Sequence, residues 1–355
     1  MERIGRLLRL AGLGQGEAIL IHKPSNVFYL SGFTGEGLLL IAEGLGAIVT
    51  DFRYVEQAQN QAPDWQVHSI SPQKGHIKLT AELAGQAGIR SLLYEDDQVT
   101  VKQFTAMEQA FEGSAFRPLN QLPETLRQVK DAEELGHIRR ACAISCQAFE
   151  QLLPRIKPGM SEKQVKHDLD FTMLALGADG IAFSTIVASG PNGSLPHAIA
   201  GDRKLQKGDM ITFDFGALSG GYCADMTRTI ALGEPDPQMR RIYDIVLHAQ
   251  QTCQDALAPG KDCRAIDQIA RDIIGEAGYG ECFGHGLGHA VGIDIHEEPR
   301  LSQTATAQLE PGIVITVEPG IYVPGLGGVR IENSCVITQD GVESLVTAPR
   351  ELIIL

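Results

Sequence analysis

Short apolar runs alternate with amphipathic segments along the first third of the chain. Each run has four or five mostly apolar residues, which is typical of a buried strand, and the segments between the runs have helical spacing. The runs are residues 18–21, 38–42, 47–50 and 91–94. This alternation predicts a small α/β domain over residues 1–123, because the pattern lapses into Pro and Asn between Phe116 and Pro123.

A long amphipathic helix is predicted from Asp131 onward. Leu135, Ile138, Cys142 and Leu152 recur at three- and four-residue spacing, while charged residues occupy the other faces. We expect this helix to open a second domain over residues 124–355.

The second domain contains an internal repeat. A Pro-Gly pair at 158–159 precedes a helical stretch that ends at Gly177, and a pair at 259–260 precedes one that ends at Gly278. In both copies 19 positions separate the proline from the final glycine. A glycine at this place suits a helix C-terminus, so the same helix is predicted twice.

The repeat extends to the helix starts and to a strand downstream. Ser161 and Asp262 are suitable N-caps at equivalent places, and Gln164 can complete a capping box with Ser161. The segments LQKGDMITFDFG and LEPGIVITVEPG also match, and they place Asp214 and Glu318 at equivalent positions. We therefore expect two related α+β halves about a pseudo-two-fold axis.

Composition and charge exclude several classes of protein. Of the 355 residues, 43% are apolar and 21% are charged, which is ordinary for a globular chain. The net charge of −14 has the wrong sign for a general nucleic-acid binder, and no apolar run is long enough to span a membrane. Seven cysteines without Cys-x-x-Cys spacing favour reduced thiols in a cytoplasmic protein.

Four acidic residues stand at two predicted hairpins. The midpoint between Asp214 and Asp225 falls in the turn-like stretch LSGG, and the midpoint between Glu318 and Glu332 falls in PGLGG. Residues symmetric about a hairpin turn face each other with Cβ atoms about 4.5–5.5 Å apart. Each pair could share a proton, face the solvent or hold a cation, and its occurrence in both halves favours the cation.

Histidines supply the remaining candidate ligands. The segment FGHGLGHAVGIDIHEEP contains His285, His289 and His296, of which His285 could be a ligand, a supporting residue or a packed turn residue. His197 lies in a Gly/Pro-rich loop 17 residues before Asp214 and could overhang the same site or simply face the solvent. Imidazole with four carboxylates suits two divalent ions of manganese, cobalt, iron or zinc, which can activate a water near neutral pH.

These motifs resemble the pita-bread metallopeptidases, specifically the Xaa-Pro branch that comprises aminopeptidase P and prolidase. The resemblance rests on the ordered acids and histidine together with HGLGH, HEEP, TVEPGIY and GGVRIEN, and it covers essentially the whole chain. It implies an α+β protein with an N-terminal domain of the creatinase/prolidase type before the pita-bread domain. SGFTGEG and TDFRYVEQA also look like family segments, and the resemblance implies a homodimer in which each N-terminal domain lines or restricts the partner's active-site entrance.

The resemblance also implies roles for individual residues. Asp214 would bind one metal ion, His289 and Glu318 the other, and Asp225 and Glu332 would bridge them. Two ions, with manganese favoured, are expected.

Further roles concern the residues around these ligands. Glu318 would also manage a proton, and His197 and His296 would stabilise the tetrahedral intermediate or assist the departing nitrogen. His285 becomes a supporting residue. Arg330 would orient an acid ligand, contact the substrate carboxylate or form a structural ion pair.

The expected reaction is hydrolysis of the bond between an N-terminal residue and proline in short peptides. The motifs serve an Xaa-Pro aminopeptidase and an Xaa-Pro dipeptidase equally. A methionine-aminopeptidase-like enzyme and a non-enzymatic pita-bread peptide-binding module are the alternatives. The five intact ligand types argue against the binding module and against metal-free creatinase, and the first 123 residues argue against a methionine aminopeptidase.

Overall fold

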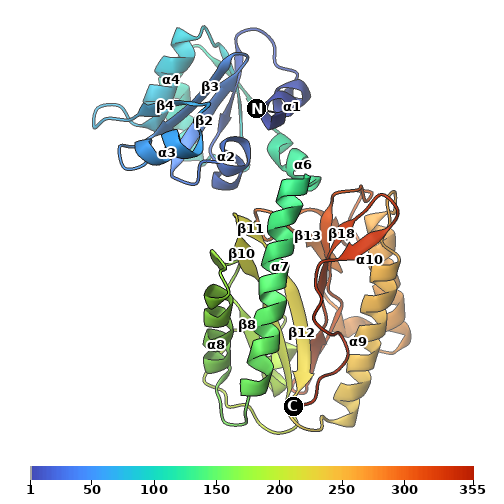
Figure 1. Cartoon of the computed structure of the whole chain (residues 1–355). Helices are drawn as coiled ribbons and strands as arrows, with labels where there is room; N and C mark the ends of the chain where they lie inside the picture. The colour runs from blue at the N-terminus through green and yellow to red at the C-terminus, as the bar shows by residue number, and fades with distance from the viewer. Residues whose placement is uncertain (1) are drawn as a thin grey trace. The chain divides into compact units, whose positions relative to one another are not determined.

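The computed structural model describes residues 2–355, which form two compact units (Figure 1). The first unit ends at Arg127 and the second begins at Gln128, four residues beyond the expected boundary at residue 123. The reason is a short helix, α6 (Leu122–Gln128), which belongs largely to the first unit. Its Arg127 is buried and donates hydrogen bonds to Ser25 Oγ and Asn26 Oδ1.

The first unit is built on one six-stranded mixed sheet with the strand order β4-β3-β2-β1-β5-β6. Its strands are β1 (Glu17–Ile21), β2 (Gly37–Ala42), β3 (Leu45–Thr50), β4 (Gln66–Ser69), β5 (Ser91–Tyr94) and β6 (Ala115–Pro118). Its helices besides α6 are α1 (Glu2–Ala11), α2 (Pro24–Ser31), α3 (Val55–Gln61), α4 (His76–Gln86) and α5 (Val101–Ala110). The four predicted strands are confirmed as β1, β2, β3 and β5.

The edge strands β4 and β6 escaped prediction from sequence. Both are short and contain only exposed and half-buried residues, and neither carries an apolar run. Each is held by parallel pairing with an inner strand, β4 with β3 and β6 with β5.

The second unit begins with α7 (Ala132–Leu152), whose N-cap Asp131 forms a capping box with Glu134. The helices and strands of its first half are α8 (Glu162–Ala175), β7 (Gly180–Ile181), β8 (Ile186–Ser189), β9 (Met210–Phe215), β10 (Ala217–Ser219), β11 (Tyr222–Cys223) and β12 (Met226–Ala231). Those of its second half are α9 (Pro237–Asp255), α10 (Cys263–Glu276), β13 (Gly288–Ala290), β14 (Glu297–Leu301), β15 (Val314–Val317), β16 (Gly320–Val323), β17 (Gly327–Arg330), β18 (Asn333–Ile337) and β19 (Val342–Ser344). Three short 3-10 helices, η1 (Leu153–Arg155), η2 (Gly190–Ser194) and η3 (Gly280–Cys282), complete the unit.

The predicted repeat is present in the fold. Helices α8 and α10 both have 14 residues and begin after the N-caps Ser161 and Asp262. Strands β8, β9 and β12 are neighbours in one sheet, and β13, β15 and β18 are neighbours in the same order in another. Helices α7 and α8 contact each other, as do α9 and α10, so each half has its own helix pair (Figure 1). The acids and histidines of interest lie on the strands and loops between these helices.

Neither a membrane-spanning helix nor a disulfide is found among residues 2–355. Among residues 2–355 no helix combines the length and apolar content needed to cross a membrane. All seven cysteines are free, and six of them are buried. Because these thiols lie in the protein interior, burial raises the pKa of Cys142, Cys253, Cys263 and Cys335.

Candidate metal centre

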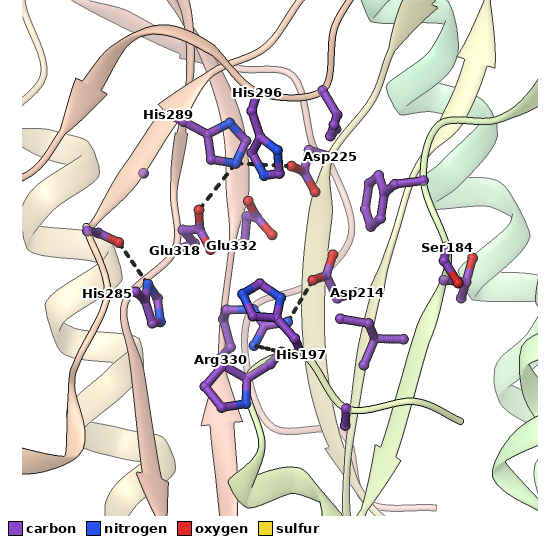
Figure 2. A pocket seen from close by; sticks show the side chains of 18 of the residues that line it. Ser184, His197, Asp214, Asp225, His285, His289, His296, Glu318, Arg330 and Glu332 are labelled. Carbon is purple, nitrogen blue, oxygen red and sulfur yellow. Dashed lines mark hydrogen bonds and ion pairs between the residues drawn. The ribbon is translucent and has the colours of Figure 1, made fainter. Parts of the chain in front are cut away.

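The first acidic hairpin has a different register from the expected one. Strand β9 pairs with β12 so that Asp214 lies opposite Thr227, whereas direct opposition of Asp214 and Asp225 was expected. The two-residue turn is Gly220-Gly221, with φ of 57° and 81°, because such turns need a positive φ at both central residues. The turn centre therefore lies one residue later than the midpoint between the acids. Asp225 still points into the same site (Figure 2).

The second acidic hairpin has the expected register. Val317 pairs with Asn333 and Gly320 pairs with Arg330, so Glu318 and Glu332 occupy matching positions between these pairs. Both residues lie where the strands leave one sheet and have not yet entered the next. Their backbone N–H groups turn to other partners, since Glu318 donates to Leu287 and Glu332 to Thr227.

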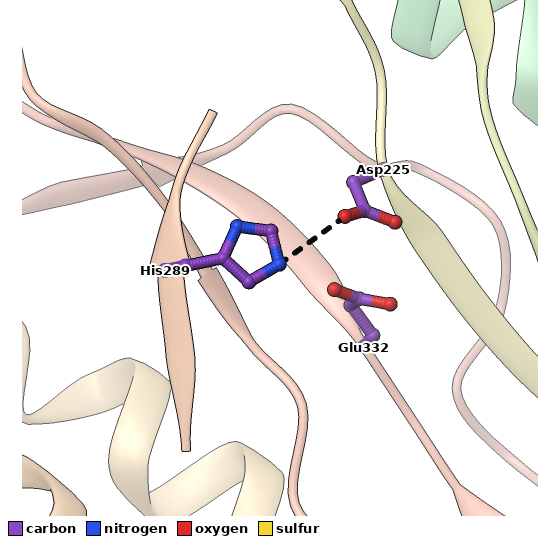
Figure 3. A group of neighbouring side chains, drawn as sticks. All are labelled: Asp225, His289 and Glu332. Atoms are coloured by element: carbon purple, nitrogen blue, oxygen red, sulfur yellow. Dashed lines mark ion pairs between the residues drawn. The ribbon is translucent and has the colours of Figure 1, made fainter. Parts of the chain in front are cut away.

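His289 aims a lone pair at the carboxylates. Its Nδ1 lies 3.1 Å from the carbonyl oxygen of Ala290, which can only accept, so Nδ1 carries the proton and Nε2 does not. Burial and nearby His296 lower the pKa of His289 to about 3, which keeps the ring neutral. Nε2 lies 3.5 Å from Asp225 Oδ2 and 3.4 Å from Glu318 Oε1 (Figure 3 shows Asp225). Acceptor atoms facing one another in this way need a cation or a proton between them.

Other atoms of the cluster also fit a cation. Single donor atoms of Asp225, His289 and Glu332 all lie within 4.8 Å of one another, and all three residues are buried. Asp214 Oδ1 and Glu332 Oε1 are buried without a hydrogen-bond partner. Such atoms are rare unless an ion or water completes them. The donor set of one imidazole and four carboxylates therefore fits divalent metal ions, with Asp214, Asp225, His289, Glu318 and Glu332 as the groups that would hold them.

The pKa values of the carboxyl groups in the cluster also favour a bound cation. Burial and neighbouring Glu332 raise the pKa values of Asp225 and Glu318. Burial and nearby Asp214 raise the pKa of Glu332 to about 8. Without a cation these carboxyl groups repel one another and resist ionisation. The site is thus arranged for a positive charge that the protein itself supplies only in part.

Arg330 supplies the positive charge that the protein itself contributes to the cluster. It is buried, and its Nη2 lies 2.7 Å from Asp214 Oδ2. Its Nη1 donates to the hydroxyl of Tyr322 at 2.9 Å, and that hydroxyl lies 2.9 Å from His285 Nε2. His285 Nδ1 is 2.8 Å from the carbonyl oxygen of Gly286. Both ring nitrogens of His285 are thereby engaged, so the structure places this histidine beside the ligand cluster and outside it.

One pocket of about 510 Å³ contains all nine predicted site residues. The carboxylates line its base, and His197 and His296 are exposed side chains at its edge (Figure 2). The ring of His296 packs edge-on against that of His289 with centroids 4.4 Å apart. His197 comes from the loop after β8 and lies near Asp214 and Arg330 in the same view.

Sequence reasoning missed two members of the site. Thr227 donates its hydroxyl hydrogen to Glu332 Oε2 at 2.6 Å, and Tyr322 connects Arg330 to His285. Alternation along the strand could have found Tyr322, because positions 318, 320 and 322 share a face. No local signal marks Thr227, whose partner lies 105 positions away.

Comparison with known proteins gives full-length relatives. The model of metallopeptidase family M24 matches residues 136–339, and that of the creatinase/prolidase N-terminal domain matches residues 3–129. An Xaa-Pro dipeptidase of Pyrococcus furiosus is 35% identical, and the alignment covers 99% of both chains.

Solved structures agree with this result. An Xaa-Pro dipeptidase structure from Bacillus anthracis superposes with a TM-score of 0.95 and 41% identity, covering 100% of this chain and 99% of the other. An X-Pro aminopeptidase structure from Thermotoga maritima has a TM-score of 0.91 and 36% identity, covering 99% and 100%. The two family models fall in order on the two compact units, and the likeness in structure extends over the whole length. The chain therefore belongs to metallopeptidase family M24 and carries the creatinase/prolidase N-terminal domain ahead of its pita-bread peptidase domain.

Proposed function

We propose that this chain is an exopeptidase with two divalent metal ions that hydrolyses the bond between an N-terminal residue and proline. The observation that carries the proposal is the convergence of four carboxylates and the unprotonated Nε2 of His289 at the base of one pocket. Full-length relatives named Xaa-Pro dipeptidase and X-Pro aminopeptidase support the choice of bond. That bond is a tertiary amide without an N–H group, so the enzyme must recognise it without that donor.

The metal ions define the chemistry of the site. Membership of the family implies divalent metal ions, and we favour two manganese ions, with cobalt, zinc and iron as alternatives. When bound, such ions polarise a carbonyl oxygen and lower the pKa of water. Asp214 would serve one ion, His289 and Glu318 the other, and Asp225 and Glu332 both.

The chain's own residues handle orientation and protons. Glu318 combines a place at the pocket base with a carboxyl group that can take up a proton, so we assign it the proton of the attacking water. His197 and His296 are imidazoles at the pocket edge, where they can donate to the oxygen of the tetrahedral intermediate or to the departing nitrogen. Arg330 fixes the orientation of Asp214 through their 2.7 Å contact.

The proposal also covers the oligomeric state of the enzyme, its location and its partners. We propose a homodimer in the cytoplasm that acts on short proline-containing peptides and binds no nucleic acid, in line with the net charge of −14 and the seven free cysteines. The N-terminal unit would serve in dimerisation and line the partner's active-site entrance. Mass measurement of the native protein in solution tests the dimer.

The decisive experiment is hydrolysis by metal-stripped protein after manganese, cobalt or zinc is restored. Ala-Pro, Ala-Pro-Ala and Met-Ala-Ser are offered in parallel, with Glu318→Gln as the inactive control. Cleavage of the dipeptide alone identifies a dipeptidase, and release of Ala from the tripeptide identifies an aminopeptidase. Cleavage of the methionyl peptide alone contradicts the Xaa-Pro assignment. Binding of two ions without any hydrolysis favours a peptide-binding role.

A further inference from the structure

The loop that carries His197 into the site is tied at both ends to one buried carboxylate. This loop, residues 190–200, follows β8, and its residues 196–200 line the pocket. Leu195 and Ile199 are 57% and 88% exposed, whereas Ala198 is buried in a cluster with Ile186 and Ala188, and the carbonyl oxygen of Pro196 accepts from Arg330 Nη1 at 3.4 Å. The position of the imidazole therefore depends on these contacts and on how the ends of the loop are anchored.

The anchor is Glu162, the first residue of α8, whose side chain is buried (1% exposed). Its Oε1 accepts hydrogen bonds from the backbone N–H of Ser189 at 2.8 Å and from the Ser189 hydroxyl at 2.7 Å. Its Oε2 accepts from Asn192 Nδ2 at 3.0 Å and from the N–H of Gly201 at 3.1 Å. One carboxylate thus joins the strand before the loop, the first turn of the loop and its last residues.

This set of contacts differs from the ordinary role of an acid at a helix start. A carboxylate there usually stabilises its own helix through the dipole, but Ser161 already caps α8 with Gln164. The four hydrogen bonds of Glu162 instead go to residues 27 to 39 positions away. Arg203 extends the anchor, because it donates to the Ser189 hydroxyl at 2.5 Å and pairs with Asp209 at 2.6 Å.

The second half of the unit holds its loop histidine through a glutamate at a different position. Its loop after β13 carries His296, and the helix position equivalent to Glu162 is occupied by Cys263. There the anchoring glutamate is the first residue of β14, directly after the loop. Glu297 accepts from the N–H of Asp294 at 3.1 Å and pairs with the buried ammonium of Lys130 at 3.1 Å. Each half thus holds its loop histidine with a buried glutamate, although the glutamates come from different places in the repeat.

We infer that Glu162 is a positioning residue that holds His197 in its catalytic place by fixing both ends of the 190–200 loop. The inference rests on the proposed peptidase function. Glu162→Gln keeps the size of the side chain but replaces one acceptor oxygen by an NH₂ group, which then faces two donors. At least the hydrogen bond from one backbone N–H, that of Ser189 or that of Gly201, is lost, and the loop and its imidazole shift. Because a displacement of about 1 Å can cost about 10²-fold in rate, kcat should fall by about 10- to 100-fold while KM changes less than about threefold.

The test compares four forms of the manganese-loaded protein on the best peptide substrate: the parent, Glu162→Gln, His197→Ala and the double variant. If Glu162 acts through His197, adding Glu162→Gln to His197→Ala changes kcat by less than about twofold. Glu134→Gln is the matched control, since Glu134 is also buried and accepts from the Tyr222 hydroxyl, away from the loop. It should keep kcat within about twofold. A Glu162→Gln variant with parental kcat, or with the same loss in both backgrounds, overturns the inference.

Hydrogen exchange of residues 190–201 provides a measurement that needs no turnover. In the manganese-loaded Glu162→Gln protein these amides should exchange faster than in the parent, with two ions still bound, and unchanged exchange overturns the anchoring. If the parent hydrolyses no peptide, the proposed function fails, and the exchange result still decides whether Glu162 holds the loop. Asn192→Ala removes one of the four hydrogen bonds and replaces Glu162→Gln if that variant does not fold. It should show the same faster exchange and a smaller loss of kcat.

Discussion

Manganese binding to the metal-stripped protein should release protons from carboxyl groups and none from His289. In the metal-free protein, burial and Asp214 raise the pKa of Glu332 to about 8, and the pKa values of Asp225 and Glu318 are raised as well. A ligand to a divalent ion must be a carboxylate, so binding expels these protons. The pKa of His289 lies near 3, and its ring is already neutral at pH 7.

The size of the effect follows from these pKa values. A group with a pKa of about 8 is protonated in about nine-tenths of molecules at pH 7 and in about a quarter at pH 8.5. Glu332 alone should therefore release about 0.9 proton per chain at pH 7 and about 0.25 at pH 8.5. Asp225 and Glu318 add to this, so the carboxyl groups together should release between about one and three protons at pH 7, and a metal-bound water that ionises adds up to about one more.

Calorimetry in several buffers measures this release. Titration of manganese into the stripped protein is repeated at each pH in buffers with different ionisation enthalpies, and the slope of observed enthalpy against ionisation enthalpy counts the protons. Glu332→Gln should lower the release at pH 7 by at least about 0.9 proton, because it also removes the repulsion that raises the other two pKa values. Release below about 0.3 proton at pH 7, or a difference between the parent and Glu332→Gln that grows with pH, would refute the reasoning.

Three further substitutions test the fold. Gly216→Ala would place a Cβ 1.8 Å from the carbonyl oxygen of Ala224, so the hairpin must open, and we expect loss of manganese affinity by calorimetry together with a lower melting temperature. Phe149→Ala empties a fully buried site and should cost about 3–5 kcal/mol in denaturant unfolding, whereas a cost under about 1 kcal/mol would contradict the packing. Burial lowers the pKa of His22 to about 4, so the unfolded state takes up this proton first as the pH falls from 6.5 to 4, and up to about 3 kcal/mol of stability is lost. His22→Leu should flatten this pH dependence, read from the fluorescence of Trp65, the only tryptophan.

Local patterns were sufficient for much of the fold. The four inner strands of the first unit, the start of α7 at Asp131 and the twin helices α8 and α10 all follow from apolar spacing and capping residues. Strands β4 and β6 did not follow, because exposed edge strands carry no apolar run and take their shape from a neighbour. Helix α6 was missed where Pro and Asn obscured the pattern, and this displaced the expected domain boundary.

The register of the first acidic hairpin follows from a local rule, the preference of a Gly-Gly dipeptide for a two-residue turn. The Gly-Gly dipeptide at 220–221 is a strong signal for a turn with a positive φ at both central residues, and it sets the register that places Asp214 opposite Thr227. Centring the turn between the two acids places the turn one residue too early and the partner of Asp214 two residues too early. The acids nevertheless converge, because diagonal neighbours on one face remain within reach of a common centre.

The side chains that could form the centre are recognisable in the amino-acid sequence, since each candidate lies in a motif of its own and keeps its chemical type wherever the chain places it. Their pairing depends on the tertiary fold. Arg330 meets Asp214 across 116 positions, Thr227 meets Glu332 across 105, and the ring nitrogens of His285 are taken up by Gly286 and Tyr322. The first two contacts form because the two halves pack against each other, and that of His285 with Tyr322 forms because the chain within the second half folds back on itself. No periodicity within a single strand or helix encodes such distances.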